Sequence, residues 1–349
     1  MLHSKNAVAV PPGETIREQL ENRGMSQKEF AHRMGMSEKH ISELLNGKVE
    51  LTYNVSLRLE SVLGIPAKFW NNLEALYREK LARVNAELEF EKDEEIAKKF
   101  PYAKIAEFGW VKPTRKISEK VENLRSYFEV ARLDLLETIQ VPGIAYRKMG
   151  ENETSDYASA AWAQRAKLLA RNIKVSPINI KRLKDIILQI RSLTIEDPEV
   201  FCEKLKSMLS ECGVAIVFLP HVSGSFLHGA SFIDGSHIVL GLTVRGKDAD
   251  KFWFSLFHEL YHIIEGHIYN LHGTTEEQES LADEFARDTL IPMKNYQAFV
   301  EKGDFSEGSI VQFAKSVDVK ECIVLGRLQK ENFVPYNWHQ RLKVRYIIE

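Results

Sequence analysis

Hydrophobic and polar positions along most of the 349-residue chain repeat with the period of an α-helix. Over residues 14–80 the apolar positions form short helical stretches separated by glycines, and the same periodicity returns over 101–212 and about 249–330. Apolar residues three and four positions apart give a helix one buried face, so these regions predict packed amphipathic helices. Proline residues interrupt the middle region at Pro113, Pro142 and Pro177.

A different pattern, rich in β-branched and aromatic residues and punctuated by glycine, occupies residues 213–220, 224–233 and 237–244. It predicts three strands. Asp234 and Gly235 lie between the last two strands, where a type I′ hairpin turn needs residues that tolerate positive φ at both central positions. We therefore expect an α+β fold that is mainly α with a small β-sheet.

Composition and charge narrow the class of protein. The content of 44% hydrophobic and 28% charged residues is that of a soluble globular chain. The net charge of −2 excludes general coating of nucleic acid but allows one DNA-binding module. The three cysteines form no CxxC pair, which indicates reduced thiols. No signal peptide and no membrane-spanning run is present, so we expect a cytoplasmic protein with no membrane association.

Residues 24–48 have the layout of two short helices joined by a glycine turn. Ser26 is placed as the N-cap of the first helix, with Glu29 completing a capping box, and Gly35 ends it. Ser37 then caps a second helix with an apolar inner face and a polar outer face. This is the plan of a helix-turn-helix DNA-binding module, although an ordinary helical bundle with a solvated face fits the same pattern.

The outer face of this module predicts the contacts with double-stranded DNA. Residues at the start of the second helix would meet base edges, and three further polar residues would lie near phosphates. The candidate DNA-binding residues are Gln27, Ser37, Lys39, His40, Ser42, Asn46 and Lys48.

The strongest chemical signal is the sequence HELYH at residues 258–262. His258 and His262 are four residues apart, so on a helix both imidazoles can reach one Zn²⁺. Glu259 is then the candidate general base, which takes the proton of a metal-bound water. The competing interpretation makes both histidines hydrogen-bonded core residues. His267 is expected to interact with the helix C-terminus.

A second helical stretch, residues 274–292, supplies the missing third ligand. Glu279 and Asp283 are four residues apart on one face. Glu279 would complete a His₂Glu site, and Asp283 would accept the free ring N–H of a ligand histidine. Glu276 and Glu277 are the next candidates for the third ligand, but they fit the apolar phase of the helix less well.

Two family resemblances follow from these motifs. The segments FWFSLFHELYH and EQESLADEFARDTLIP resemble the ImmA/IrrE family of zinc metallo-endopeptidases over roughly residues 200–330. This resemblance implies a zincin-like fold, Glu279 as third ligand and Glu259 as general base. It also implies that a repressor is the protein substrate, and residues 224–233 are our candidate for the edge strand that pairs with the substrate backbone.

The leading PPGE, LLNGK and SLRLESVLGIPAKFWNNLEALY resemble the XRE helix-turn-helix family, in particular its HigA-type antitoxin branch. That resemblance covers about 70 residues and implies a five-helix-type DNA-binding domain that recognises an operator. An antitoxin of that type would end near residue 100, whereas this chain continues to residue 349.

We accordingly expect a DNA-binding transcriptional regulator with a zinc endopeptidase domain that cleaves a regulatory protein, either a repressor or itself. If it cleaves itself, the exposed stretch 85–100 is the expected cleavage region. His228 and Arg245 are the candidate oxyanion donors. The alternative is a transcription factor or antitoxin whose peptidase-like domain senses a metal or ligand without cutting. A homodimer is also left open.

The expected domain organisation has five parts. They are a helix-turn-helix domain (1–80), a helical linker (81–100), a helical middle region (101–200), a zincin-like metallopeptidase domain (201–300) and a helical C-terminal extension (301–349).

Overall fold

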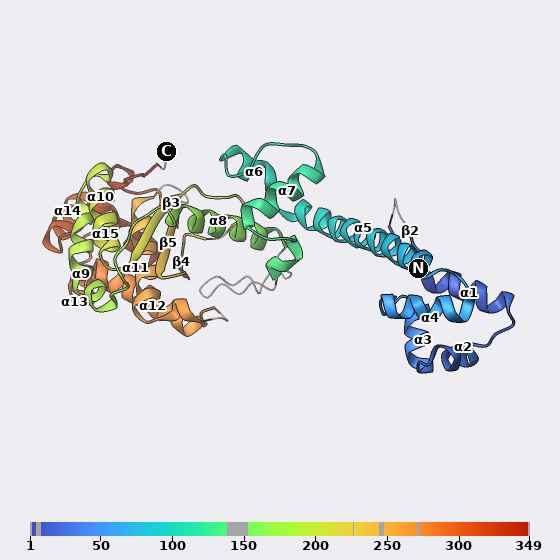
Figure 1. The fold of residues 1–349 in the computed structure, drawn as a ribbon. Helices are drawn as coiled ribbons and strands as arrows, with labels where there is room; N and C mark the ends of the chain where they lie inside the picture. Colours follow the sequence, from blue (N-terminus) through green and yellow to red (C-terminus); the bar gives the residue numbers. More distant parts are fainter. Residues whose placement is uncertain are drawn as a thin grey trace. The chain divides into compact units, whose positions relative to one another are not determined.

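The computed structural model describes residues 2–4, 8–137, 153–225, 227–243, 248–270 and 273–347 (Figure 1). The chain divides by its contacts into two compact units, Met1–Glu95 and Ile96–Glu349. Helices dominate the described residues, and two small sheets accompany them, which confirms the prediction of a mainly α chain. No helix in the described ranges has both the length and the apolar content needed to cross a bilayer.

The first unit is built from short helices around one core. Its elements are β1 (Leu2–His3), β2 (Val8–Ala9), α1 (Pro12–Asn22), α2 (Gln27–Met34), α3 (Glu38–Leu45), α4 (Tyr53–Leu63) and most of α5 (Ala67–Lys99). The core contains the fully buried side chains of Ile16, Phe30, Ile41, Leu59 and Trp70. All five helices contribute to it, so the apolar stripes read from the sequence meet in one place.

The caps of α2 and α3 follow the sequence with one correction. Ser26 Oγ accepts the N–H of Glu29 at 3.1 Å, and Ser37 Oγ accepts the N–H of His40 at 3.2 Å. The carboxylate of Glu29, however, binds the guanidinium of Arg33 at 2.6 Å. The expected reciprocal capping box at α2 is therefore present only on the Ser26 side. Gly35 ends α2 with a φ of 60°.

The charged stretch expected to form a separate connecting helix is instead the second half of α5, which runs without a break for 33 residues. Residues 85–99 of the expected cleavage region therefore lie within α5. Peptide bonds inside a helix are internally hydrogen-bonded, whereas a peptidase that pairs its substrate with a strand needs an extended backbone. A cut in this region would require local unfolding of α5.

The second unit places helices before and after a three-stranded sheet. Preceding the sheet are α6 (Tyr102–Glu107), α7 (Ile117–Phe128), η1 (Leu133–Glu137), α8 (Glu153–Ala170), α9 (Ile180–Ser192), η3 (Leu193–Ile195) and α10 (Pro198–Ser210). Following it are α11 (Ala249–Ile264), η5 (His267–Tyr269), α12 (Glu276–Leu290), α13 (Met293–Lys302), α14 (Glu307–Ser316), α15 (Glu321–Lys330) and η6 (Gln340–Leu342). Pro113 and Pro177 lie between helices, as predicted, and Pro142 lies outside the described residues.

The sheet has the strand order β3-β5-β4 and contains β3 (Val214–Leu219), β4 (Gly229–Asp234) and β5 (His237–Thr243). Strand β5 pairs parallel to β3 and antiparallel to β4, so β4 is an edge strand of this sheet. The predicted hairpin is present, but its turn is one residue later than expected. Asp234 pairs with His237, and Gly235 supplies the positive φ of 62°. Burial of the flanking strands fixes this register.

Both faces of the sheet are covered, which explains the uninterrupted apolar run of β3. Val214 and Ile216 point into a core shared with α9, α10, α11 and α15. Ala215 and Val217 point to the opposite face, where Trp162 of α8 is fully buried against them. Side chains alternate along a strand, so one strand serves two cores. Helix α11 is thereby fixed against one face of the sheet.

Candidate functional site

Helix α11 presents His258, Glu259 and His262 on one side, and its opposite side is anchored in the core. Trp253, Leu256 and Leu260 are fully buried there. Residues three and four positions apart share a helix face, so this anchoring directs His258 and His262 together toward α12. The two helices pack against each other in the structure.

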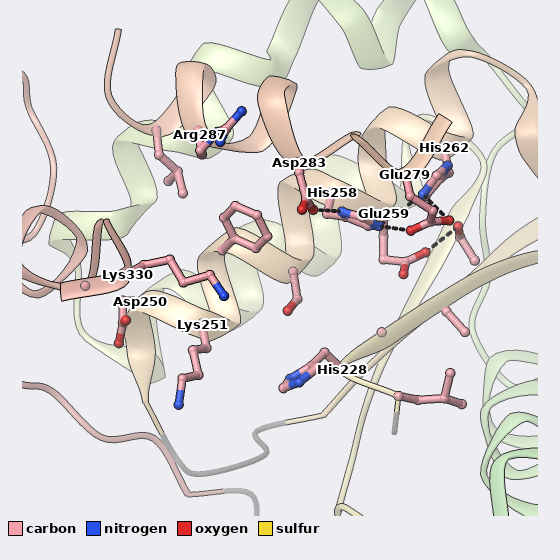
Figure 2. A pocket seen from close by; sticks show the side chains of 18 of the residues that line it. His228, Asp250, Lys251, His258, Glu259, His262, Glu279, Asp283, Arg287 and Lys330 are labelled. Atoms are coloured by element: carbon pink, nitrogen blue, oxygen red, sulfur yellow. Dashed lines mark hydrogen bonds and ion pairs between the residues drawn. The ribbon is translucent and has the colours of Figure 1, made fainter. Parts of the chain in front are cut away.

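The structure brings His258, His262 and Glu279 into one cluster whose ligand atoms all lie within 4.8 Å of one another (Figure 2). The Nε2 atoms of the two histidines are 3.1 Å apart, and Nε2 of His258 is 3.1 Å from Oε2 of Glu279. Nε2 of His262 is 3.5 Å from Oε1 of the same carboxylate. Tetrahedral ligands at about 2.0–2.1 Å from a metal stand about 3.3 Å apart, so this donor set fits a metal ion without rearrangement.

Glu279 is held in place by the start of α12. Thr275 caps this helix, and Thr275 and Gln278 form a reciprocal capping box. Thr274 Oγ1 donates a hydrogen bond to Oε1 of Glu279. Among the described residues, the metal-competent group includes neither Glu276 nor Glu277, the other candidates for the third ligand.

The outer ring nitrogens of both histidines have defined partners. Nδ1 of His258 lies 2.8 Å from Oδ1 of Asp283, as the spacing predicted. Nδ1 of His262 lies 2.9 Å from Nδ1 of His267. Sequence reasoning missed this second contact, because it placed His267 at the helix C-terminus. Gly266, with a φ of 74°, turns the chain after α11 and returns His267 toward the cluster.

Charges within the cluster are strongly coupled. Burial lowers the pKa of His258, but the hydrogen bond to Glu279 and the charge of Glu259 outweigh it and raise that pKa to about 9. Hydrogen bonds from His258 and His262 hold the pKa of Glu279 far below its usual range. Burial and the neighbouring His262 lower the pKa of His267. A neutral His267 can accept the Nδ1–H of His262, which leaves Nε2 of His262 available as a ligand.

Glu259 lies beside the cluster and against strand β4. Ser231 Oγ donates a hydrogen bond of 2.7 Å to Glu259 Oε2. A Cβ atom at Gly229 would lie only 2.8 Å from Glu259 Cγ, so a glycine in β4 makes room for this side chain. Burial raises the pKa of Glu259, and the hydrogen bond from Ser231 partly offsets that rise. Neither β4 residue was identified from the sequence, since no local pattern links a strand to a helix that follows it.

The cluster opens into a cleft of about 1080 Å³ that runs along α11. Edge strand β4 forms one wall, and α12 and α15 contribute to another. His228, a candidate oxyanion donor, is exposed and lines this cleft, and its backbone C=O accepts the N–H of Thr243 at 3.0 Å. The other candidate, Arg245, lies outside the described residues.

The candidate DNA-binding residues differ in exposure and in whether their side chains already form hydrogen bonds within the unit. Gln27, Lys39 and Lys48 are exposed, and His40 and Ser42 are half-buried. The two remaining candidates already have partners within the unit.

Ser37 uses its hydroxyl to cap α3. The amide group of Asn46 donates to the Ser42 carbonyl at 2.8 Å and accepts from Arg17 at 2.7 Å. Asn46 is therefore held in one orientation near the end of α3.

Comparison with known proteins identifies this first unit. A family described as "Helix-turn-helix" matches residues 16–70. An uncharacterised HTH-type transcriptional regulator, YddM, from Escherichia coli K12 is 36% identical over 63 residues, which are 18% of this chain and 67% of that protein. The chain belongs to the helix-turn-helix family. The match extends from α1 into the first turn of α5.

Among solved structures, this helix-turn-helix protein is similar to an addiction module antidote protein of a HigA family from Coxiella burnetii. The identity is 29%, the match covers 24% of this chain and 94% of that one, and the TM-score is 0.22. The family match at residues 16–70 does not reach the metal-competent cluster of the second unit.

Proposed function

We propose that the chain is a DNA-binding transcriptional regulator that carries a zinc-dependent endopeptidase in its second unit. The observation that supports the peptidase is the cluster itself. Three ligand atoms of His258, His262 and Glu279 converge, with Glu259 adjacent, in a cleft bordered by an edge strand. As part of this proposal, the second unit is an ImmA/IrrE-type peptidase with the zincin-like fold that the sequence resemblance implies.

Zinc is the metal that suits the donor set best. Two imidazole nitrogens and one carboxylate oxygen leave a fourth tetrahedral position open, which is the arrangement of catalytic zinc sites. Bound there, Zn²⁺ would polarise a carbonyl group and lower the pKa of a water molecule. Asp283 and His267 orient the two imidazoles through their outer nitrogens, at 2.8 and 2.9 Å.

Glu259 is the proposed general base. Burial raises the pKa of its carboxyl group, which makes the carboxylate a better proton acceptor near neutral pH. Ser231 fixes Oε2, so the carboxyl group is held in one orientation beside the cluster. The proton that Glu259 receives would then pass to the leaving amine of the cleaved peptide. Strand β4 is an edge strand, and in this proposal it would pair with an extended substrate backbone along its outer edge.

The peptidase proposal is tested with the zinc-loaded chain and a mixture of synthetic peptides, with products identified by mass spectrometry. We expect new peptide ends from the wild type and none from Glu259→Gln, with zinc content equal in both. A wild type that binds zinc but cuts no peptide and no XRE-type repressor would favour the alternative, in which the second unit senses a metal or ligand.

For the first unit, we propose binding of the α3 surface to an operator in the cytoplasm. The helix-turn-helix family match and the HTH-type regulator to which this unit is similar support this proposal. For the second unit, the proposal further includes residues 201–300 as the peptidase domain and a repressor as its substrate. For the whole chain, it includes assembly as a homodimer. A HigA-like antitoxin role predicts a small toxin gene beside this one on the chromosome.

A further inference from the structure

The two carboxylate oxygens of Glu279 have different partners. Oε2 lies 3.1 Å from Nε2 of His258. Oε1 lies 3.5 Å from Nε2 of His262 and accepts a hydrogen bond from Oγ1 of Thr274. Figure 2 shows Glu279 beside both histidines. The hydroxyl of Thr274 therefore binds one oxygen of the ligand carboxylate and leaves the other close to His258.

The start of α12 places this hydroxyl and the carboxylate together. Thr274 directly precedes Thr275, the N-cap of the helix. The N–H of Thr275 donates to Gln278 Oε1 at 3.0 Å, and Thr275 Oγ1 accepts the N–H of Gln278 at 3.2 Å. The N–H of Glu279 donates to the carbonyl of Thr275 at 3.0 Å. Because this reciprocal cap fixes the backbone between the two residues, the same turn that carries the ligand also sets the position of Thr274.

Metal binding would leave Thr274 as the residue that orients the carboxylate. The Nε2 atoms of His258 and His262 are the proposed ligand atoms, so a bound metal ion takes the place of their contacts with Glu279. Among the described residues, the contact with Thr274 is the one that this carboxylate would keep. The hydroxyl therefore decides how Glu279 faces the metal.

This orientation matters because a carboxylate can bind zinc through one oxygen or through both. Two imidazoles and both oxygens would fill four positions, whereas a single oxygen leaves the fourth position open for water or substrate. A hydrogen bond to one oxygen uses a lone pair and fixes the plane of the carboxylate, which favours coordination through the other oxygen. In this site the favoured oxygen is Oε2 of Glu279.

We propose that Thr274 is a positioning residue that makes Glu279 a ligand through Oε2 alone and so keeps one metal position open. The inference rests on the proposed zinc site and adds a residue that determines its coordination number. Without the hydroxyl, Glu279 would turn and bind the metal through both oxygens.

The test replaces zinc with Co²⁺, which takes the same nitrogen and oxygen ligands and absorbs visible light. Four-coordinate Co²⁺ absorbs more strongly than Co²⁺ with five ligands, so the spectrum reports the coordination number. The full-length wild type, Thr274→Val and Thr274→Ser are each loaded with an equimolar amount of Co²⁺. The wild type and Thr274→Ser should show the intense spectrum, and Thr274→Val should lose much of that intensity. Its zinc affinity, measured by competition with a chelator, should fall about tenfold.

Thr289→Val is the matched control, because it makes the same exchange on α12 at a residue that belongs neither to the metal-competent group nor to the cleft lining of the described residues. It should keep the wild-type spectrum and zinc affinity. If Thr274→Val does not fold, Thr274→Ala removes the same hydroxyl and should show the same loss of intensity. An unchanged Co²⁺ spectrum in a folded variant without the hydroxyl would overturn the proposal, even if zinc bound more weakly, because Thr274 would then act on stability alone.

Peptide cleavage by the zinc-loaded forms of the same proteins separates this proposal from the peptidase. A changed spectrum in Thr274→Val, together with a wild type that cuts no peptide, supports the positioning role and counts against the peptidase. Cleavage by the wild type with equal spectra in both proteins refutes the positioning role and leaves the peptidase standing. A wild type that takes up neither Co²⁺ nor zinc refutes both.

Discussion

Gly229→Ala is the substitution that tests the placement of Glu259, the proposed general base, most sharply. An added Cβ atom would lie 2.8 Å from Glu259 Cγ and 2.9 Å from Leu242 Cδ2. Gly229 lies in strand β4 and is not among the glycines with positive φ, so alanine fits its backbone without strain. The new methyl group therefore meets these two side chains first.

The displacement follows from van der Waals distances. Non-bonded carbons prefer about 3.5–4.0 Å, so Glu259 must move by about 1 Å to relieve the contact. The three atoms nearest the new methyl group belong to Glu259 and Leu242, whereas the ligand atoms of the metal cluster come from other side chains. A misplacement of about 1 Å in a reacting group can cost about 100-fold in rate. We expect a loss of that size in peptide cleavage, with zinc bound as in the wild type.

The assay measures zinc content and the rate of peptide cleavage on the same preparations. Gly308→Ala is the control, because a Cβ atom at that position on α14 would meet nothing within 4 Å. It should cleave at the wild-type rate. A Gly229→Ala protein that holds zinc and cleaves as fast as the wild type would refute the assigned position of Glu259.

Three further predictions concern the other parts of the two sites. His267→Ala should weaken zinc binding about 10- to 100-fold, because His262 loses the partner of its outer nitrogen, and unchanged affinity in a zinc titration would count against that role. Lys39→Ala/His40→Ala should weaken binding to a DNA fragment from the chain's own promoter in a mobility-shift assay; wild-type affinity would mean that α3 is not the reading helix. Since the metal-free pKa of His258 is raised to about 9, zinc must displace its proton, and the apparent Kd should fall about tenfold per pH unit from pH 7 to pH 9. Calorimetry that finds no proton release at pH 7 would contradict this coupling.

Local sequence patterns were enough to predict the elements whose chemistry lies within one helix. The four-residue spacing of His258 and His262, and of Glu279 and Asp283, sets each pair on one face, and the structure brings the two pairs together. The helix caps at residues 26 and 37 are similarly local. These features depend on residue types and spacings within one helical turn, so they can be read from a short stretch of sequence.

Features that depend on packing between distant segments could not be predicted. The contact of Ser231 with Glu259 joins residues 28 positions apart, and only the register of β4 places them together. The continuity of α5 was also not predicted. The charged second half of this helix has few apolar positions, so the sequence pattern did not show that it continues the helix that begins at Ala67. The hairpin turn was misplaced by one residue, because burial of both strands, rather than turn propensity, set the pairing of Asp234.

The measurement that tests the central claim most directly is the metal content of the tag-free chain, by inductively coupled plasma mass spectrometry, beside the Glu279→Ala variant. The geometry of the cluster predicts about one zinc ion per chain in the wild type and its loss in the variant. Absence of metal after incubation with zinc, or equal metal in both proteins, would contradict the proposed His₂Glu site.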